Sequence, residues 1–108
     1  MSAMRILIVA SFASLLVAPA LADNTTLTLK DHKFTPAEIH VKANEASTIL
    51  FVNNDDTAEE FDSSALKIEK VVAGHGQGTI HLRALAPGKY PFMGEYHSDT
   101  AQGLVIAE

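Results

Sequence analysis

Alternation of apolar and polar residues is the feature that most restricts the fold of this 108-residue chain. Leu27 and Leu29 alternate with threonine and lysine, and Ile80 and Leu82 alternate with polar residues in the same way. Strands with one buried face give this period of two, and no apolar stripe of helical spacing competes with it. Six or seven short strands at this spacing predict an all-β Greek-key β-sandwich.

The expected strands are separated by residues that favour turns, such as the run Asn53 to Asp56. We expect a loop after this run that reaches Phe61 or beyond, and one short helical turn over 63–67. The expected strands cover 26–30, 39–42, 47–52, 68–72, 80–85, 90–92 and 104–107.

The first residues have the pattern of a secretory signal peptide. Arg5 precedes an apolar run over 6–18, and Ala20, Leu21 and Ala22 form a small-residue cleavage site. The run is shorter than the roughly 20 residues that a spanning helix needs, and Pro19 ends it. We therefore expect cleavage of residues 1–22, export to the periplasm and a single domain over 23–108.

Charge and cysteine content exclude several classes of function. The chain has 8 basic and 13 acidic residues and a formal charge of −5, and loss of Arg5 would leave one more net negative charge. Nucleic acid is therefore an unsuitable partner. With no cysteine, the chain has no disulfide, iron–sulfur or thiolate-zinc chemistry. Catalytic triads, phosphate loops and dinucleotide fingerprints are absent from the sequence, so any catalysis must depend on a metal.

Four stretches together resemble one known family. They are "FTPAEIHVKAN", "FVNNDDTAEEFDS", "IEKVVAGHGQG" and "PGKYPFMGEYHSDTAQG", and they cover nearly all of 23–108. In this order they resemble the cupredoxins, and more narrowly the small periplasmic cupredoxin-like domains of EfeO type that accompany bacterial Ftr/Efe-type iron-uptake systems. The resemblance implies a cupredoxin-like β-sandwich with a metal site at one end.

The resemblance also implies which positions surround the ion. Copper-carrying members use a histidine after the Asn-Asn turn, a cysteine, a second histidine and an axial methionine or glutamine. Gly94 stands at the cysteine position, His97 at that of the second histidine and Gln102 at the axial place. Counting from Phe51 favours Glu59 at the first position, whereas the "EEF" pattern favours Glu60. Without a thiolate, a blue copper centre is excluded.

The remaining donors are carboxylates and one imidazole, a set that suits Cu(II), iron, manganese and zinc far better than Cu(I). Anionic oxygen also favours Fe(III) over Fe(II), which makes iron a sensible choice. Glu95 and His97 are one residue apart in a loop, where both are expected to point to one side. Glu69 is included because of the "EKVV" resemblance; alternatively it forms a surface ion pair with Lys67 or Lys70. Acidic runs in loops are often only solvated. The candidate metal ligands are Glu60, Glu95, His97, Glu69, Glu59 and Gln102.

We expect from this a periplasmic, non-blue metal-binding protein that assists iron uptake. The ion would be iron or copper, and the protein would be at most a metal-dependent ferroxidase-type accessory. Its expected partner is a periplasmic iron-binding protein or an inner-membrane iron permease. The alternative is a metal-free interaction module that docks on such a partner, and metal affinity separates the two hypotheses.

Overall fold

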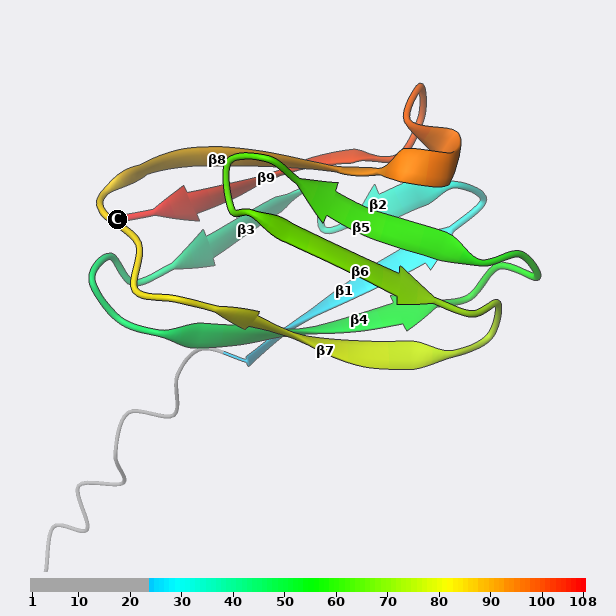
Figure 1. The fold of residues 1–108 in the computed structure, drawn as a ribbon, viewed down its shortest axis with the longest axis horizontal. Coiled ribbons are helices and arrows are strands. Elements are labelled where there is room, and N and C mark those ends of the chain that lie inside the picture. The colour runs from blue at the N-terminus through cyan, green and yellow to red at the C-terminus, as the bar shows by residue number, and fades with distance from the viewer. Residues whose placement is uncertain (1–23) are drawn as a thin grey trace, which may run out of the picture.

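Two β-sheets pack face to face in this protein, whose computed structural model describes residues 24–108 (Figure 1). The first sheet has the order β2-β1-β4-β7 and the second the order β3-β9-β8-β5-β6. A 3₁₀ helix, η1 (Glu95–His97), follows β8 directly. The strands of the first sheet are β2 (Lys33–Thr35), β1 (Asn24–Lys30), β4 (Ser47–Asn53) and β7 (Gln77–Leu82). Those of the second are β3 (Glu38–Val41), β9 (Gln102–Ala107), β8 (Gly88–Gly94), β5 (Glu59–Ser63) and β6 (Ile68–Val72).

The predicted all-β sandwich is confirmed, and its core lies between the two sheets. Parallel pairing of β1 with β4 and of β3 with β9 shows that the chain crosses between the sheets, while the other pairs are antiparallel. Four phenylalanines join the layers: Phe61 stacks on Phe92 with ring centroids 4.8 Å apart, and Phe34 meets the edges of Phe51 and Phe92. Such aromatic pairs add to the stabilisation from apolar burial. They fix β5, which carries Glu59 and Glu60, and β8, which leads directly into η1 with Glu95 and His97.

The sequence prediction was wrong in its details. Residues 24–108 form nine strands rather than six or seven, because β2 and β5 were not expected. The loop after Asn53 does not reach Phe61, because β5 begins at Glu59. Its inward-facing residues are Glu59, Phe61 and Ser63, so two of the three are polar and the apolar alternation is hidden. Residues 64–67 form a turn rather than a helical segment, and Ser63 Oγ accepts a hydrogen bond from the backbone N–H of Leu66.

The predicted signal peptide lies outside the described residues. Within 24–108, no helix is long and apolar enough to cross a membrane.

Candidate metal centre

The first residue of β5, Glu59, has a fully buried carboxylate at the end of the sandwich near η1. Its Oε1 accepts the backbone N–H groups of Tyr96 at 2.9 Å and Glu60 at 3.0 Å. Its Oε2 lies 2.5 Å from Nδ1 of His97. A buried carboxylate is costly unless it is paired and hydrogen-bonded. Both oxygens of Glu59 therefore have protein donors.

The Glu59 carboxylate occupies the space that a side chain at position 94 would need, and residue 94 is glycine. A Cβ built on Gly94 would be 2.7 Å from Cδ of Glu59 and 2.8 Å from Cβ of Ala101. The φ of Gly94 is −87°, so space rather than backbone conformation requires glycine here. A thiolate at this position would overlap the Glu59 carboxyl group. The donor set of a blue copper centre therefore does not fit this pocket.

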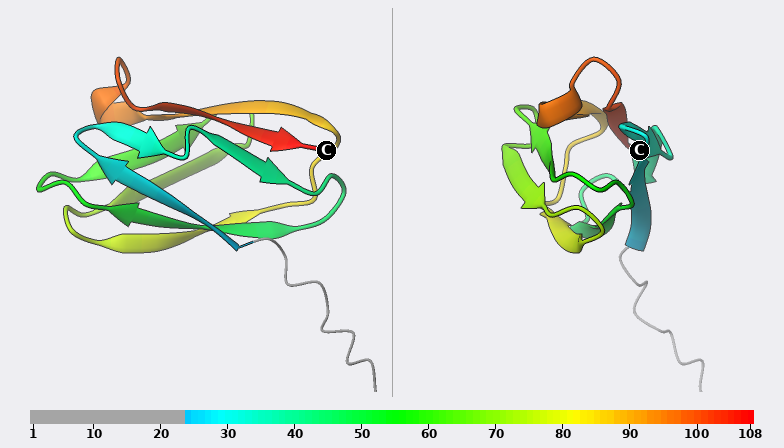
Figure 2. Two further views of the ribbon diagram at one scale, coloured as in Figure 1. Left: turned by 180° about the vertical axis from the view of Figure 1, so that it is seen from behind. Right: turned by 90° about the vertical axis from the view of Figure 1, so that its right-hand side faces the viewer.

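His32, in the turn between β1 and β2, covers the His97 ring. The turn and η1 lie at the same end of the sandwich (Figures 1 and 2). The two imidazoles stack with centroids 3.5 Å apart and an interplanar angle of 12°. Asp55 fixes the turn, since its two carboxylate oxygens accept the backbone N–H groups of Asp31 at 2.7 Å and His32 at 2.9 Å. Burial raises the pKa of Asp55, but these hydrogen bonds and the nearby positive groups outweigh it and lower the pKa below its ordinary value.

A second group of carboxylates lies on the outer side of the five-stranded sheet. One oxygen from each of Glu60, Asp62 and Glu69 lies within 4.8 Å of the others. Asp62 of β5 is directly opposite Glu69 of β6, so the two side chains share one face. We call Glu60, Asp62, Glu69 and the neighbouring Glu95 the acidic face.

Glu95 joins this group from η1. A hydrogen bond to the side chain of Asp62 raises the pKa of Glu95, and the charges of Asp62, Glu60 and Glu69 together with partial burial raise it further. Tyr96 borders the same group: burial raises its pKa, as do the charge of Glu60 and a hydrogen bond to that carboxylate. The hydrogen bond between Glu95 and Asp62 needs a proton on one of the two carboxyl groups. The charges of Asp62, Glu60 and Glu69 disfavour the ionised form of Glu95.

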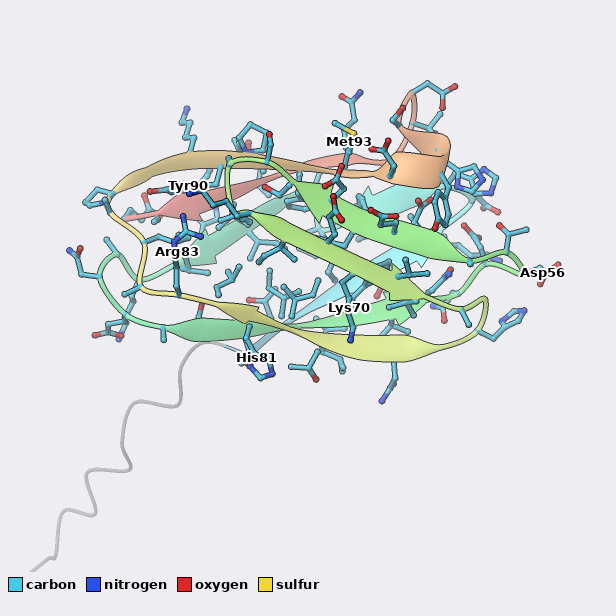
Figure 3. All side chains as sticks on the ribbon, viewed as in Figure 1. Asp56, Lys70, His81, Arg83, Tyr90 and Met93 are labelled. Atoms are coloured by element: carbon cyan, nitrogen blue, oxygen red, sulfur yellow. The ribbon has the colours of Figure 1, made fainter. Side chains whose placement is uncertain are left out.

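The structure thus divides the predicted ligands between two sides of β5. Glu60, Glu69 and Glu95 lie on the acidic face, whereas Glu59 and His97 form the inner pair. Gln102 is exposed on β9, and its amide donates to the backbone oxygen of Ser98 at 2.9 Å. Strand register places Glu69, Asp62, Met93 and Gln102 in one cross-strand row, and Met93 points away from the sheet (Figure 3).

Two residues of these sites were not among the predicted ligands. Asp62 is the centre of the acidic face, and its position could have been recognised from Glu60 two residues earlier once β5 was known to be a strand. The second residue is His32, in the turn between β1 and β2. Its contact with His97 depends on the packing of two segments distant in sequence, so no local pattern indicates it.

Comparison with known proteins agrees with the fold. The model of the cupredoxin-like domain family matches residues 3–107. An uncharacterized protein of Rickettsia prowazekii (strain Madrid E) is 45% identical over 80 residues, which are 74% of this chain and 64% of that protein. The chain therefore spans less than two thirds of this relative.

Solved structures with the same fold include several copper proteins. Auracyanin A, a "blue" copper protein from Chloroflexus aurantiacus, has a TM-score of 0.66 and 16% identity over 79% of this chain and 98% of its own. The metal-binding domain of the Cu(I)-exporting P-type ATPase of Streptococcus pneumoniae D39 has a TM-score of 0.67 and 13% identity, over 79% and 84%. Amicyanin from Paracoccus versutus has a TM-score of 0.62 and 18% identity, over 84% and 87%. The match of the family model over nearly the whole chain shows that this protein belongs to the cupredoxin-like domain family.

Proposed function

We propose that this chain is a periplasmic, non-blue metal-binding protein that binds iron on its acidic face and assists iron uptake. The observation that carries the proposal is the convergence of Glu60, Asp62 and Glu69, whose oxygens lie within 4.8 Å of one another. Glu95 adds a fourth carboxylate, which is hydrogen-bonded to Asp62. A bound cation would remove the mutual repulsion that these groups have in the free protein.

The chemistry of the donors favours iron over Cu(I). Carboxylate oxygens are hard, anionic ligands, whereas Cu(I) prefers thiolate and thioether sulfur. Anionic oxygen also stabilises Fe(III) relative to Fe(II). Bound Fe(II) would therefore lose an electron more readily to an external oxidant. In this way the protein could act as a ferroxidase-type accessory.

The cellular setting of the proposal comes from the sequence. The predicted signal peptide over 1–22 favours the periplasm. The resemblance to cupredoxins of Ftr/Efe-type systems favours an iron permease or a periplasmic iron-binding protein as the recipient of the ion.

A second candidate function is a metal-free docking module, and one observation favours it. Val71, Met93 and Tyr96 are 54%, 39% and 51% exposed. Val71 pairs with Glu60 and Met93 pairs with Asp62, so apolar side chains border the acidic face. Exposed apolar groups beside charges are common at protein interfaces. A basic, partly apolar partner surface would suit this face.

Titration with Fe(II) under anaerobic conditions distinguishes the two functions. We expect the wild-type protein to bind Fe(II), and Asp62→Asn and Glu69→Gln each to weaken binding by about 10-fold or more, since even outer residues of metal sites contribute about 10- to 100-fold. Glu45→Gln, a change at an exposed acid in the turn before β4, should leave binding unchanged. If calorimetry and thermal melts detect no effect of Fe(II), Fe(III) or Cu(II) on the wild type, the docking module is the better explanation.

The raised pKa of Glu95 makes a separate prediction for the metal-free protein. A carboxyl group whose pKa is raised by folding stabilises the fold at pH values below its ordinary pKa of 4.5. This stabilisation is lost as the pH rises through the pKa that the group has in the folded protein. Glu95→Gln removes the charge but keeps the shape, so its melting temperature should exceed that of the wild type at pH 7. Below about pH 4.5 the two melting curves should converge. Equal melting temperatures at pH 7, with Glu45→Gln as the control, would contradict repulsion within the acidic face.

A further inference from the structure

A cleft where the edge strands β6 and β7 meet has the features of an anion-binding site. Its volume of about 420 Å³ is within the range of small-molecule sites, and it is lined by Leu66, Lys67, Ile68, His81 and Arg83. We infer that this cleft binds a small organic dicarboxylate, with one carboxylate at Arg83 and the other at Lys67. The inference does not depend on iron binding, because none of these five residues belongs to the acidic face.

The cleft carries positive charge that no carboxylate neutralises. The chain has 13 acidic and 8 basic residues, yet no described residue that lines the cleft is acidic. The ion pairs within 24–108 all involve a histidine, so neither Lys67 nor Arg83 has a carboxylate partner there. Lys67 also lines a neighbouring cleft with Asp62 and Glu69, but it pairs with neither. Two uncompensated cations at one cleft attract anions.

Arg83 is held in position by a turn of the opposite sheet. Its Nη1 donates to the backbone oxygen of Leu66 at 2.7 Å. Figure 3 shows the side chain reaching from the end of β7 toward the other sheet. This contact leaves Nε and Nη2 without an acceptor among the described residues. These two N–H groups are parallel and match the two oxygens of one carboxylate, as in bidentate arginine pairs.

β7 adds a backbone donor because it is an edge strand. The N–H of Asn53 donates to the oxygen of Gly76 at 2.9 Å, so this pair is hydrogen-bonded. Hydrogen-bonded pairs alternate along an antiparallel ladder, so Gly78 and Ile80 bond to β4, whereas the backbone groups of His81 point out of the sheet edge. The side chain of His81 points away from β6 (Figure 3), so its backbone N–H is the group that can donate to an anion in the cleft.

Lys67 places a cation in a turn whose backbone favours another residue type. Its φ is 57°. The other non-glycine residues with positive φ within 24–108 are aspartate, asparagine or histidine, the types that tolerate this conformation best. Asparagine would therefore fit the backbone at position 67 better than lysine does. The property that lysine adds at this position is its charge.

Apolar side chains form the floor of the cleft. Leu66 is buried and Ile68 is half-buried, and both line it, so a carbon chain between two carboxylates would contact them. Lys70 closes the space toward the start of β7, since its Cε lies 3.0 Å from the place that a Cβ of Gly78 would occupy (Figure 3). An inorganic anion would contact the cations without using the apolar floor. The lining therefore favours an organic acid.

Titration of the metal-free, tag-free protein with succinate, followed by amide chemical shifts in NMR spectra, tests this site. We expect the largest shifts at His81 and in the turn 66–68. Arg83→Lys keeps the charge but loses the two parallel N–H groups, so it should weaken binding at least about 10-fold, the usual loss for a charged hydrogen bond. Lys67→Asn should weaken binding about 2- to 5-fold, as for an exposed ion pair, and asparagine suits the positive φ.

Exposed lysines elsewhere provide matched controls. Lys42→Gln and Lys89→Gln should leave succinate affinity unchanged. Inorganic phosphate at the same ionic strength should bind more weakly than succinate, and Arg83→Lys should keep wild-type Fe(II) binding, which separates this site from the acidic face. A melt without ligand checks that both cleft variants fold; if Arg83→Lys does not, Lys67→Asn decides the test.

Three results would overturn the inference. The first is a titration in which succinate shifts no group of signals at the cleft. The second is phosphate binding as tight as that of succinate. The third is wild-type succinate affinity in Lys67→Asn, or a loss in Lys89→Gln as large as that in the cleft variants.

Discussion

A single methyl group added at Gly94 is expected to lower the free energy of unfolding by about 1–3 kcal/mol, the usual cost of overpacking a well-packed site. The new Cβ would be 2.7 Å from Cδ of Glu59 and 2.8 Å from Cβ of Ala101. Glu59 cannot move aside without breaking its hydrogen bonds to Tyr96 and His97. Because φ at Gly94 is −87°, the backbone conformation there is allowed for alanine. Without the steric overlap, alanine would stabilise the fold by about 0.4–1 kcal/mol, because it lowers the conformational entropy of the unfolded chain.

Urea unfolding of Gly94→Ala and of Gly88→Ala measures this effect against a matched control. Gly88 lies at the other end of the same strand, and a Cβ there would have its nearest neighbour at 3.6 Å, which is an ordinary contact. Gly88→Ala should therefore match the wild type or exceed its stability by up to about 1 kcal/mol. Gly94→Cys should be destabilised as Gly94→Ala is and should give no intense blue band with Cu(II). Wild-type stability of Gly94→Ala would mean that the Glu59 carboxyl group moves easily and that the pocket is not closed.

The sequence predicted the two sheets because most strands have one apolar face. β1 shows this clearly, since the fully buried Leu27 and Leu29 alternate with threonine and lysine. β5 could not be recognised in the same way, because Glu59 and Ser63 are buried polar residues on either side of Phe61. Their burial depends on hydrogen bonds to Tyr96 and Pro91, which are far away in sequence. A pattern based on hydrophobicity cannot detect such a strand.

The choice between Glu59 and Glu60 depended on the same strand. Side chains alternate across a strand, so an inward Phe61 turns Glu59 inward and Glu60 outward. The inner position is therefore occupied by Glu59, and Glu60 lies on the acidic face. Once β5 is recognised, Phe61 alone is enough to assign both residues.

Glu95 and His97 show a second limit of prediction from sequence. In an extended loop, residues two apart point to one side, as the sequence analysis expected. In a 3₁₀ helix, which has three residues per turn, they point in directions about 120° apart. Glu95 accordingly meets Asp62, whereas His97 meets Glu59 and His32. Three residues of helix are too few for a periodic pattern, so this division of the ligands could not be predicted.

Removal of the His97 side chain is expected to give the largest loss of stability among the substitutions considered. Glu59 is fully buried, and His97→Ala would leave its Oε2 without a donor. Removing one partner of a buried charged group costs about 3–5 kcal/mol when the charge is left uncompensated. The His97 side chain is 24% exposed, so water entering the vacated space should place the loss near the lower end of this range.

His40→Ala is the control, because His40 and its partner Glu108 have side chains that are 55% and 68% exposed. Exposed pairs contribute about 0–1 kcal/mol, so this change should have little effect. Glu59→Gln should restore part of the stability lost in His97→Ala, since the amide carries no buried charge. A double-mutant cycle over Glu59 and His97, measured by urea unfolding, should therefore show a coupling energy of about 0.5–3 kcal/mol. If His97→Ala proves as stable as His40→Ala, the two backbone N–H groups alone are enough to satisfy the buried carboxylate.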